Sequence, residues 1–326
     1  MSGGDKAVET KAALKPSDFV HLHNHTHHSL LDGLTKIPDL VARVKELGME
    51  ACAITDHGTL SGTIEFYKAA KDAGIKPIIG IETYVAARTI NDRDPAKDKA
   101  RHHLILLAMN NTGYKNLMKL STIANLEGVY YKPRVDHDLL EKYNEGIIAM
   151  SACLGGEVSA PLQDDDYEKA KEVASWYKSV FGDRYYLEIQ DHQEYELQNK
   201  VNNYLFQLSE ELGIKTVVSS DAHYVNAEDQ QSHEILLCVG TGSFMSDEKR
   251  MSLTDFHLHV TDPKDVIARW AHEHPETVSN TREIADRCNV EIDLGGILIP
   301  KFPTPNGESE KEYLDELVYH GMAFRY

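Results

Sequence analysis

Nine residues with metal-binding side chains stand where predicted strands of this chain begin or end. They are His23, His25, Asp32, His57, Glu82, His103, Cys153, Asp221 and His223. Imidazole, thiolate and carboxylate groups are the ligands of zinc, and of manganese or iron in harder mixed sites. Any one of these residues could stand there by chance. Their recurrence at strand ends predicts a metal site.

His23 and His25 form the first cluster, at the end of a predicted strand. Residues two apart in a strand face the same side, so both imidazoles can bind one ion. The spacing is also typical of a solvent-facing strand. We favour that interpretation for His257 and His259, because no acidic or cysteine residue follows them in a suitable context.

Three further positions strengthen the metal hypothesis. Glu82 ends an apolar strand, where a carboxylate is costly unless it is paired or coordinated. Asp56, directly before His57, is expected to cap a helix or to hold the His57 imidazole in one tautomer. Cys153 alone would also suit a small buried apolar residue, but in this company ligation is favoured.

Nine ligands are more than one ion needs. With four or five ligands for each ion, some of them shared, they suit two or three divalent ions. Clustered ions are typical of hydrolysis at phosphorus, where one activates water and the others hold phosphoryl oxygens. The sequence has no Walker loop, no serine–histidine–aspartate order and no nucleotide-binding glycine fingerprint that would indicate another chemistry.

Seven strand-like runs alternate with amphipathic, helix-like stretches. The strands are predicted at 19–23, 51–55, 77–82, 104–108, 146–151, 185–190 and 216–219, and the helices at 37–47, 63–73, 114–124, 167–180 and 194–212. This alternation predicts parallel βα units, and seven units predict an imperfect seven-stranded barrel. Active sites of such barrels gather at the C-terminal strand ends. His103 precedes its apolar run, so its strand is either antiparallel or begins earlier.

Three regions are expected along the chain. Residues 1–16 are predicted to be a disordered leader, and residues 17–300 a barrel domain with a less regular C-terminal appendix. The appendix is expected to contain a strand at 256–260 and helices at 233–239, 263–273 and 276–287. Residues 301–326 are interpreted as a linker and the first helix of a following domain, with that helix starting at 310–322.

Composition sets limits on the function. The net charge of 34 − 52 = −18 argues against strong autonomous binding to nucleic acid, although DNA remains acceptable as a substrate. The four cysteines are widely spaced, so a disulfide framework is not expected. The chain has no run of 18 apolar residues and a polar start, which favours a cytoplasmic protein without a membrane partner.

Several motifs resemble the PHP (polymerase and histidinol phosphatase) superfamily, and within it most closely the PHP domains of bacterial DNA polymerase III alpha subunits. They are Phe19-Val20-His21-Leu22-His23-Asn24-His25, Leu31-Asp32-Gly33, Gly74-Ile75-Lys76-Pro77-Ile78-Ile79-Gly80 and Asn111-Thr112-Gly113-Tyr114-Lys115-Asn116-Leu117. The resemblance covers nearly the whole chain from Ser17. It implies a distorted (β/α)7 barrel of the PHP type, with the nine residues as ligands of two or three ions of Zn²⁺, Mn²⁺ or Fe²⁺.

The implied activity is metal-dependent 3′→5′ exonuclease proofreading on a DNA 3′ end, next to the remainder of the polymerase chain. Glu82 is expected to bridge ions. Four other positions are expected to support the ligands or to contact substrate: His21, Asp56, His102 and the Asp191/His192 pair. His27 and His28 are interpreted as part of a surface turn.

Two alternatives stay open at this point. One is a phosphomonoesterase of the histidinol phosphatase type, with the same ions acting on a small substrate. The other is a non-catalytic scaffold, in which metal ions stabilise a barrel that braces the polymerase or binds the sliding clamp or a separate proofreading subunit.

Overall fold

A computed structural model of the chain describes residues 14–192, 194–297 and 299–326. The chain divides into two compact units, which meet in sequence between Glu291 and Ile292. The predicted leader falls mostly on residues outside the described ranges. The predicted boundary after residue 300 stays a prediction.

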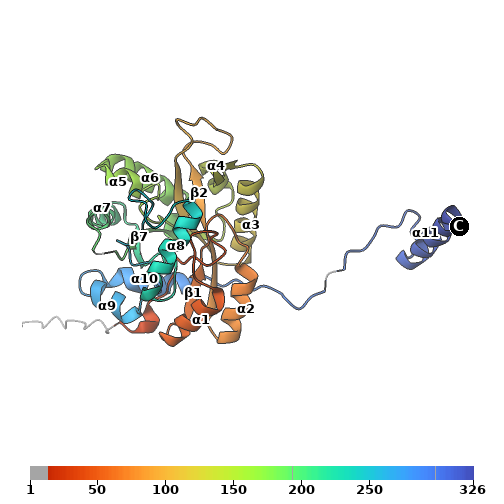
Figure 1. Cartoon of the computed structure of the whole chain (residues 1–326), viewed down its shortest axis with the longest axis horizontal. Coiled ribbons are helices and arrows are strands. Elements are labelled where there is room, and N and C mark those ends of the chain that lie inside the picture. Colours follow the sequence, from red (N-terminus) through yellow and green to blue (C-terminus); the bar gives the residue numbers. More distant parts are fainter. Residues whose placement is uncertain (1–13, 193, 298) are drawn as a thin grey trace, which may run out of the picture. The chain divides into compact units, whose positions relative to one another are not determined.

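The first unit is built around one eight-stranded sheet with helices around it (Figure 1). Its strands are β1 (Ala51–Ile54), β2 (Lys76–Ala86), β3 (Arg101–Ala108), β4 (Val129–Tyr130), β5 (Lys132–Val135), β6 (Ile147–Met150), β7 (Tyr185–Gln190) and β8 (Lys215–Ser219). The sheet runs in the order β4-β5-β2-β3-β6-β7-β8, and β1 pairs with β2.

The N-terminal segment around residues 21–26 closes this sheet into a ring. His21 pairs in parallel with Cys52 of β1, and Asn24 pairs in parallel with Ala222, just after β8. The His25 amide donates to the Ala222 carbonyl at 2.7 Å, and the Thr55 amide donates to the Asn24 carbonyl at 3.0 Å. The segment, β1, β2, β3, β6, β7 and β8 therefore form the distorted seven-membered α/β barrel that the sequence predicts.

Helices surround the barrel, as Figure 1 shows. They are α1 (Ile37–Glu46), α2 (Thr63–Ala73), α3 (Asn111–Leu126), α4 (His137–Lys142), α5 (Ser159–Gln163), α6 (Tyr167–Phe181), α7 (Glu196–Leu212), α8 (Gln230–Thr241), α9 (Pro263–Trp270) and α10 (Pro275–Arg287). Among the contacts, α2 packs on β2, α3 on β3, α7 on β7 and α10 on β8. Gly74 ends α2 with a φ of 78°, a left-handed conformation that favours glycine.

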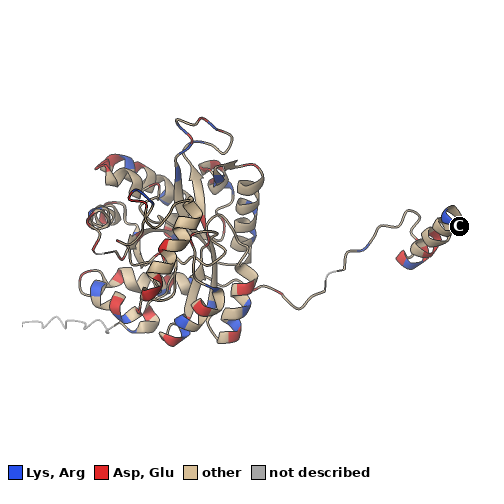
Figure 2. Ribbon diagram, in the orientation of Figure 1, with Lys and Arg blue, Asp and Glu red and all other residues tan. Residues whose placement is uncertain are grey.

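One cluster of the core consists of apolar side chains from the ring members and from α10. Among them are Val20, Ala53, Ile78, Leu107, Ile148, Val217 and Ile284, all 2% exposed or less. Strands whose residues are buried on both faces are continuous apolar runs, as Ile-Ile-Ala-Met of β6 illustrates. Figure 2 shows that charged residues lie mainly on the outer helices and loops.

The parallel βα pattern predicted for the barrel does not hold for β3, the strand for which an antiparallel direction was left open. This strand is antiparallel to both β2 and β6, because β2 and β3 follow each other as a long hairpin without a crossover helix. It also begins at Arg101, three residues earlier than predicted. The strand that carries His103 is therefore both antiparallel and longer at its start, the two possibilities considered from the sequence.

Other predicted elements differ in detail. Neither 19–23 nor 256–260 forms a regular strand. Within the first range only His21 makes an isolated pairing, with Cys52, and within the second only His259 does, with Tyr224. The hairpin of β4 and β5 and the short helices α4 and α5 were not predicted. At two to six residues, these elements are too short for a periodic pattern.

The second unit contains helix α11 (Glu310–Arg325), in the region where the sequence predicts a new helix. Ser309 and Glu312 form a reciprocal capping box that starts the helix, and none of its residues is buried. Within the described parts of the chain, no helix is long and apolar enough to cross a membrane.

Candidate metal centre

The structure brings all nine predicted residues together at one end of the barrel. Eight of them fall into three overlapping groups whose ligand atoms lie within 4.8 Å of one another: His25, His57 and His223; His23, His25, Glu82 and Asp221; and Glu82, His103 and Cys153. Asp32 adjoins the first group, with its Oδ2 atom 3.3 Å from the His57 Nε2 atom. Metal ligation by these residues remains a prediction.

Glu82 is the centre of the cluster. Its Oε2 atom lies 2.8 Å from His25 Nε2 and 3.0 Å from His57 Nδ1, and its Oε1 atom lies 2.7 Å from His103 Nδ1. It belongs to two of the three groups, so one carboxylate reaches both sides of the site. This position suits a bridging ligand.

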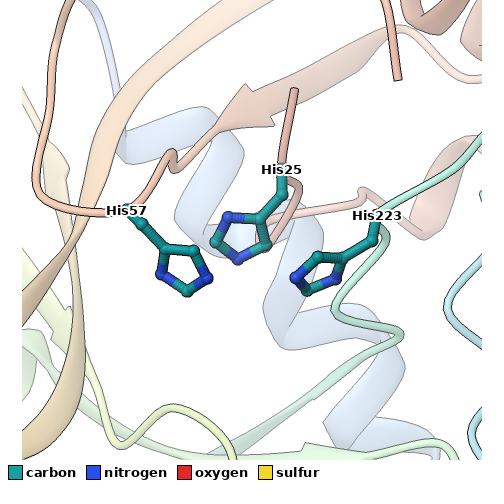
Figure 3. Close-up of side chains that lie close together, drawn as sticks. All are labelled: His25, His57 and His223. Atoms are coloured by element: carbon teal, nitrogen blue, oxygen red, sulfur yellow. The ribbon is translucent and has the colours of Figure 1, made fainter. Parts of the chain in front are cut away.

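The histidines come from separate parts of the chain but lie side by side. Figure 3 shows the imidazoles of His57, His25 and His223 in a row, with His25 in the middle. The His25 ring centroid lies 4.1 Å from that of His57 and 4.3 Å from that of His223. His23 and His25 face the same side, as their spacing predicts, with 3.0 Å between their Nε2 atoms.

Several nitrogen and oxygen atoms of the cluster lack a good hydrogen bond and are suited to bind divalent ions. Asp32 Oδ1, His57 Nδ1, Glu82 Oε1 and Asp221 Oδ1 are buried without a hydrogen bond of good geometry, although His57, Glu82 and Asp221 have oppositely charged atoms within 4 Å. Leaving a buried polar atom unsatisfied costs about 1–3 kcal/mol. Convergent, unsatisfied nitrogen and oxygen donors are what a site for two or three cations requires.

Burial and mutual attraction set the protonation of the metal-free cluster. Burial raises the pKa of Glu82, but His57 and His103 outweigh it and hold the pKa well below its usual range. Burial lowers the pKa of His57, yet Glu82 and Asp32 raise it to about 10. His223 differs, because burial and the neighbouring His25 lower its pKa to about 3. Without bound cations, protonated imidazoles therefore compensate the negative charge of the carboxylates in the cluster.

Backbone strain is concentrated beside the predicted ligands. Leu31, Ala152 and Asp221 have φ values of 72°, 60° and 50°, and each is a predicted ligand or precedes one. Left-handed conformations of such residues cost about 1–3 kcal/mol and cluster at functional sites. The strained backbone at these three residues is consistent with a requirement to place the predicted ligands at fixed positions.

Glu188 is a buried member of the site that the sequence interpretation missed. Its Oε1 atom lies 2.7 Å from His23 Nδ1 and also accepts a hydrogen bond from the Ser219 hydroxyl. It holds the His23 tautomer whose Nε2 atom faces Asp221 Oδ1 at 3.0 Å. A carboxylate within the apolar run Tyr-Tyr-Leu-Glu-Ile-Gln was the available signal, since the same argument identified Glu82.

Asp56 supports a predicted ligand, as expected, but that ligand is His25 and not His57. Its carboxylate accepts hydrogen bonds from the Thr26 amide and hydroxyl and from the Ser29 hydroxyl, at 2.6–3.1 Å, and none from the His57 imidazole. The His25 ring is in turn held by Ser29, whose Oγ atom lies 2.9 Å from His25 Nδ1. Asp56 therefore orders the loop after His25, because the donors of that loop lie closest to it.

The remaining predicted supporting residues separate into two kinds. His21 contacts the Thr261 carbonyl at 2.9 Å, and Asp191 is bound by Arg269 and Trp270, so neither faces the cluster. His192 does line the cavity, and neither of its ring nitrogens has a hydrogen-bond partner among the described residues. His102 is half-buried beside His103, and burial lowers its pKa.

A cavity of about 530 Å³ opens onto the cluster. Predicted ligands line its floor, among them Asp32, His57, Glu82, His103, Cys153, Asp221 and His223. Two cations stand over the Tyr84 ring in its wall, with Arg101 Cζ 5.8 Å and Lys132 Nζ 5.6 Å from the ring centroid. Leu30, Leu31, Met251 and Phe256 add apolar surface. The cavity thus joins a floor of predicted metal ligands to a wall that suits an anionic, partly apolar ligand.

Known proteins of similar sequence are DNA polymerase subunits. The chain is 43% identical over 314 residues to DNA polymerase III subunit alpha of Borreliella burgdorferi, and 42% identical over 317 residues to that of Thermus aquaticus. These matches cover 95% and 94% of this chain but 27% and 26% of the relatives. The chain therefore spans about a quarter of the length of these relatives.

Solved structures of similar fold are more distant. An amidohydrolase from Chromobacterium violaceum aligns with 63% of this chain and 87% of its own, at 14% identity and a TM-score of 0.44. Family membership therefore depends on the sequence comparison. The PHP domain family matches residues 21–192, a range that includes seven of the nine predicted ligands. The chain belongs to the PHP domain family.

Proposed function

We propose that this chain is a metal-dependent phosphodiesterase that removes nucleotides from the 3′ end of DNA. The observation that carries the proposal is the cluster of nine metal-binding side chains, seven of which line the floor of a cavity with two cations in its wall. The similarity to DNA polymerase III alpha subunits supports DNA as the substrate.

The residues of the cluster would hold two or three ions of Zn²⁺, Mn²⁺ or Fe²⁺. His23, His25, Glu82 and Asp221 would form one position, and Glu82, His103 and Cys153 a second that shares the Glu82 carboxylate. The third group, with His57 and His223, adjoins Asp32. Bound ions would supply Lewis-acid chemistry at phosphorus, stabilising developing negative charge and activating water for attack.

Residues of the cavity wall would position the DNA. Arg101 and Lys132 provide positive charge close to the cluster, where backbone phosphates need it, although the whole chain carries a net charge of −18. Phe256 offers an aromatic face, on which unpaired bases stack in single-strand binding sites. His192 also lines the cavity, and its buried ring nitrogens have no hydrogen-bond partner among the described residues.

The remainder of a polymerase chain is the proposed partner of this domain, with the cytoplasm as the proposed compartment. The DNA polymerase III alpha subunits similar to this chain are about four times as long. A polymerase region in the same chain would deliver a 3′ end to the cavity. Its own contacts with DNA would compensate for the weak DNA binding expected of the acidic surface of the present domain.

The test is nucleotide release from single-stranded DNA labelled at its 3′ end, with added Mn²⁺ or Zn²⁺. We expect the wild-type chain to shorten the DNA stepwise and Asp221→Asn to lose this activity. The control Asp72→Asn, which changes an exposed carboxylate, should keep it. The proposal fails if the labelled end stays intact in protein shown by elemental analysis to contain its ions. That outcome would favour the metal-stabilised scaffold.

A further inference from the structure

A second group of metal-binding side chains lies outside the central cluster. His27, His28 and Glu65 each offer one ligand atom, and these atoms lie within 4.8 Å of one another. His27 and His28 stand in the turn after the predicted ligand His25, and Glu65 lies in the first turn of α2. The group therefore spans two elements that are about forty positions apart in sequence.

The surroundings of His28 hold its ring in one orientation. The Ser61 Oγ atom lies 3.1 Å from His28 Nδ1, so the Nε2 atom is left to face Glu65. Gly62 lies against the ring, and a Cβ atom at this position would come within 2.8 Å of His28 Cδ2. A hydrogen bond to one ring nitrogen that directs the other toward a cation is the usual arrangement around metal-binding histidines.

The spacing suits a shared ion better than a direct hydrogen bond. His28 Nε2 and Glu65 Oε2 are 3.5 Å apart, at the outer limit of a hydrogen bond. Two ligands of a tetrahedral zinc ion, each about 2.0–2.1 Å from the metal, lie about 3.3 Å apart. The His27 and His28 ring centroids are 4.4 Å apart, so a second imidazole is available beside the first.

We infer that His27, His28 and Glu65 form a peripheral zinc site, separate from the central cluster. Two imidazoles and one carboxylate are a zinc-type ligand set, with water completing the coordination. An ion here ties the loop after His25 to α2. The same loop carries Leu31 and Asp32, which line the cavity, so occupancy of the peripheral site restrains one wall of that cavity.

The test measures zinc bound by the full chain in equilibrium dialysis over a range of free Zn²⁺, with elemental analysis of each sample. We expect His28→Asn and Glu65→Gln to bind one ion fewer than the wild type at intermediate zinc concentrations. Loss of a partner that merely orients a ligand costs about 10–100-fold in affinity, so loss of the ligand itself costs at least about 10-fold. Ser61→Ala should weaken the same ion without abolishing it at saturation.

A matched control is His257→Asn. His257 is an exposed histidine that, like His28, contacts a glutamate, in this case Glu194 at 2.8 Å, but it belongs to none of the three-ligand groups among the described residues. It should bind as many ions as the wild type. Because Glu65 is exposed, Glu65→Gln should fold normally, which circular dichroism checks.

Unchanged zinc binding in both His28→Asn and Glu65→Gln would overturn the inference, and so would an equal loss in His257→Asn. Asp221→Asn separates the two sites, since it should remove central ions and leave the peripheral one. Hydrogen exchange gives a readout independent of ion counting: zinc should slow exchange in residues 27–33 of Asp221→Asn, and this slowing should disappear when Glu65→Gln is added.

Discussion

Replacing Glu188 by glutamine tests whether a residue outside the predicted ligand set tunes the metal centre. The side chain is 1% exposed and accepts from His23 Nδ1 at 2.7 Å. Glutamine has nearly the same shape and keeps an oxygen that can accept this hydrogen bond. The substitution therefore removes the negative charge and leaves the packing almost unchanged.

Two magnitudes follow from this geometry. Changing a partner that orients a metal-binding histidine lowers metal affinity by about 10–100-fold, which is about 1.4–2.7 kcal/mol. In the metal-free chain, a hydrogen bond to a charged group contributes about 1.5–3 kcal/mol, and part of this is lost with the charge. Burial lowers the pKa of His23, but Asp221, Glu188 and Glu82 together raise it well above its usual value, so the imidazolium loses one of three supporting carboxylates.

The assay combines metal titration with urea unfolding of Glu188→Gln and of the exposed control Glu168→Gln. We expect weaker metal binding at unchanged final stoichiometry, and a lower free energy of unfolding for the metal-free protein. Glu168→Gln should match the wild type in both. Wild-type metal affinity in Glu188→Gln would refute the role assigned to Glu188, and loss of a whole ion would show that Glu188 is itself a ligand.

Three further predictions concern pH, ligand softness and the loop. The free energy of unfolding of the metal-free chain, measured in urea, should fall as the pH rises from about 6.5 to 10. The reason is that the His57 imidazole, whose pKa is raised to about 10, stabilises the folded state only while it is protonated. Bound metal should reduce this loss. Cys153→Ser should weaken Zn²⁺ more than Mn²⁺ in competition titrations, since thiolate favours the softer ion. Gly33→Ala should lower the Tm, because a Cβ atom would come within 2.0 Å of the Thr26 carbonyl oxygen; an unchanged Tm would contradict this packing.

The sequence was sufficient to predict most of the barrel, because its strands are short apolar runs separated by amphipathic helices. Helix α2 begins and ends at the predicted residues, and so does strand β7. The direction of β3 was not predictable from its own composition. Antiparallel pairing depends on its neighbours β2 and β6, which the apolar pattern does not specify.

Residue type and position at strand ends were enough to gather the nine candidate ligands. Parallel strands bring their C-terminal ends to one edge, and the antiparallel strand β3 brings its N-terminal end with His103 to the same edge. The contacts within the cluster could not be predicted from the sequence. Asp56 stands next to His57 in sequence, yet it binds Thr26 and Ser29, because the loop folds over it. Glu188 illustrates the opposite case, in which a readable signal was present in an apolar strand but was not used.

Elemental analysis of the purified chain beside Glu82→Gln tests whether a polynuclear metal centre is built around Glu82. Since Glu82 belongs to two of the three ligand groups, its loss should affect more than one ion. We expect two or three central ions in the wild type and at least two fewer in Glu82→Gln, in a variant that remains folded. Equal metal content in the two proteins would contradict it.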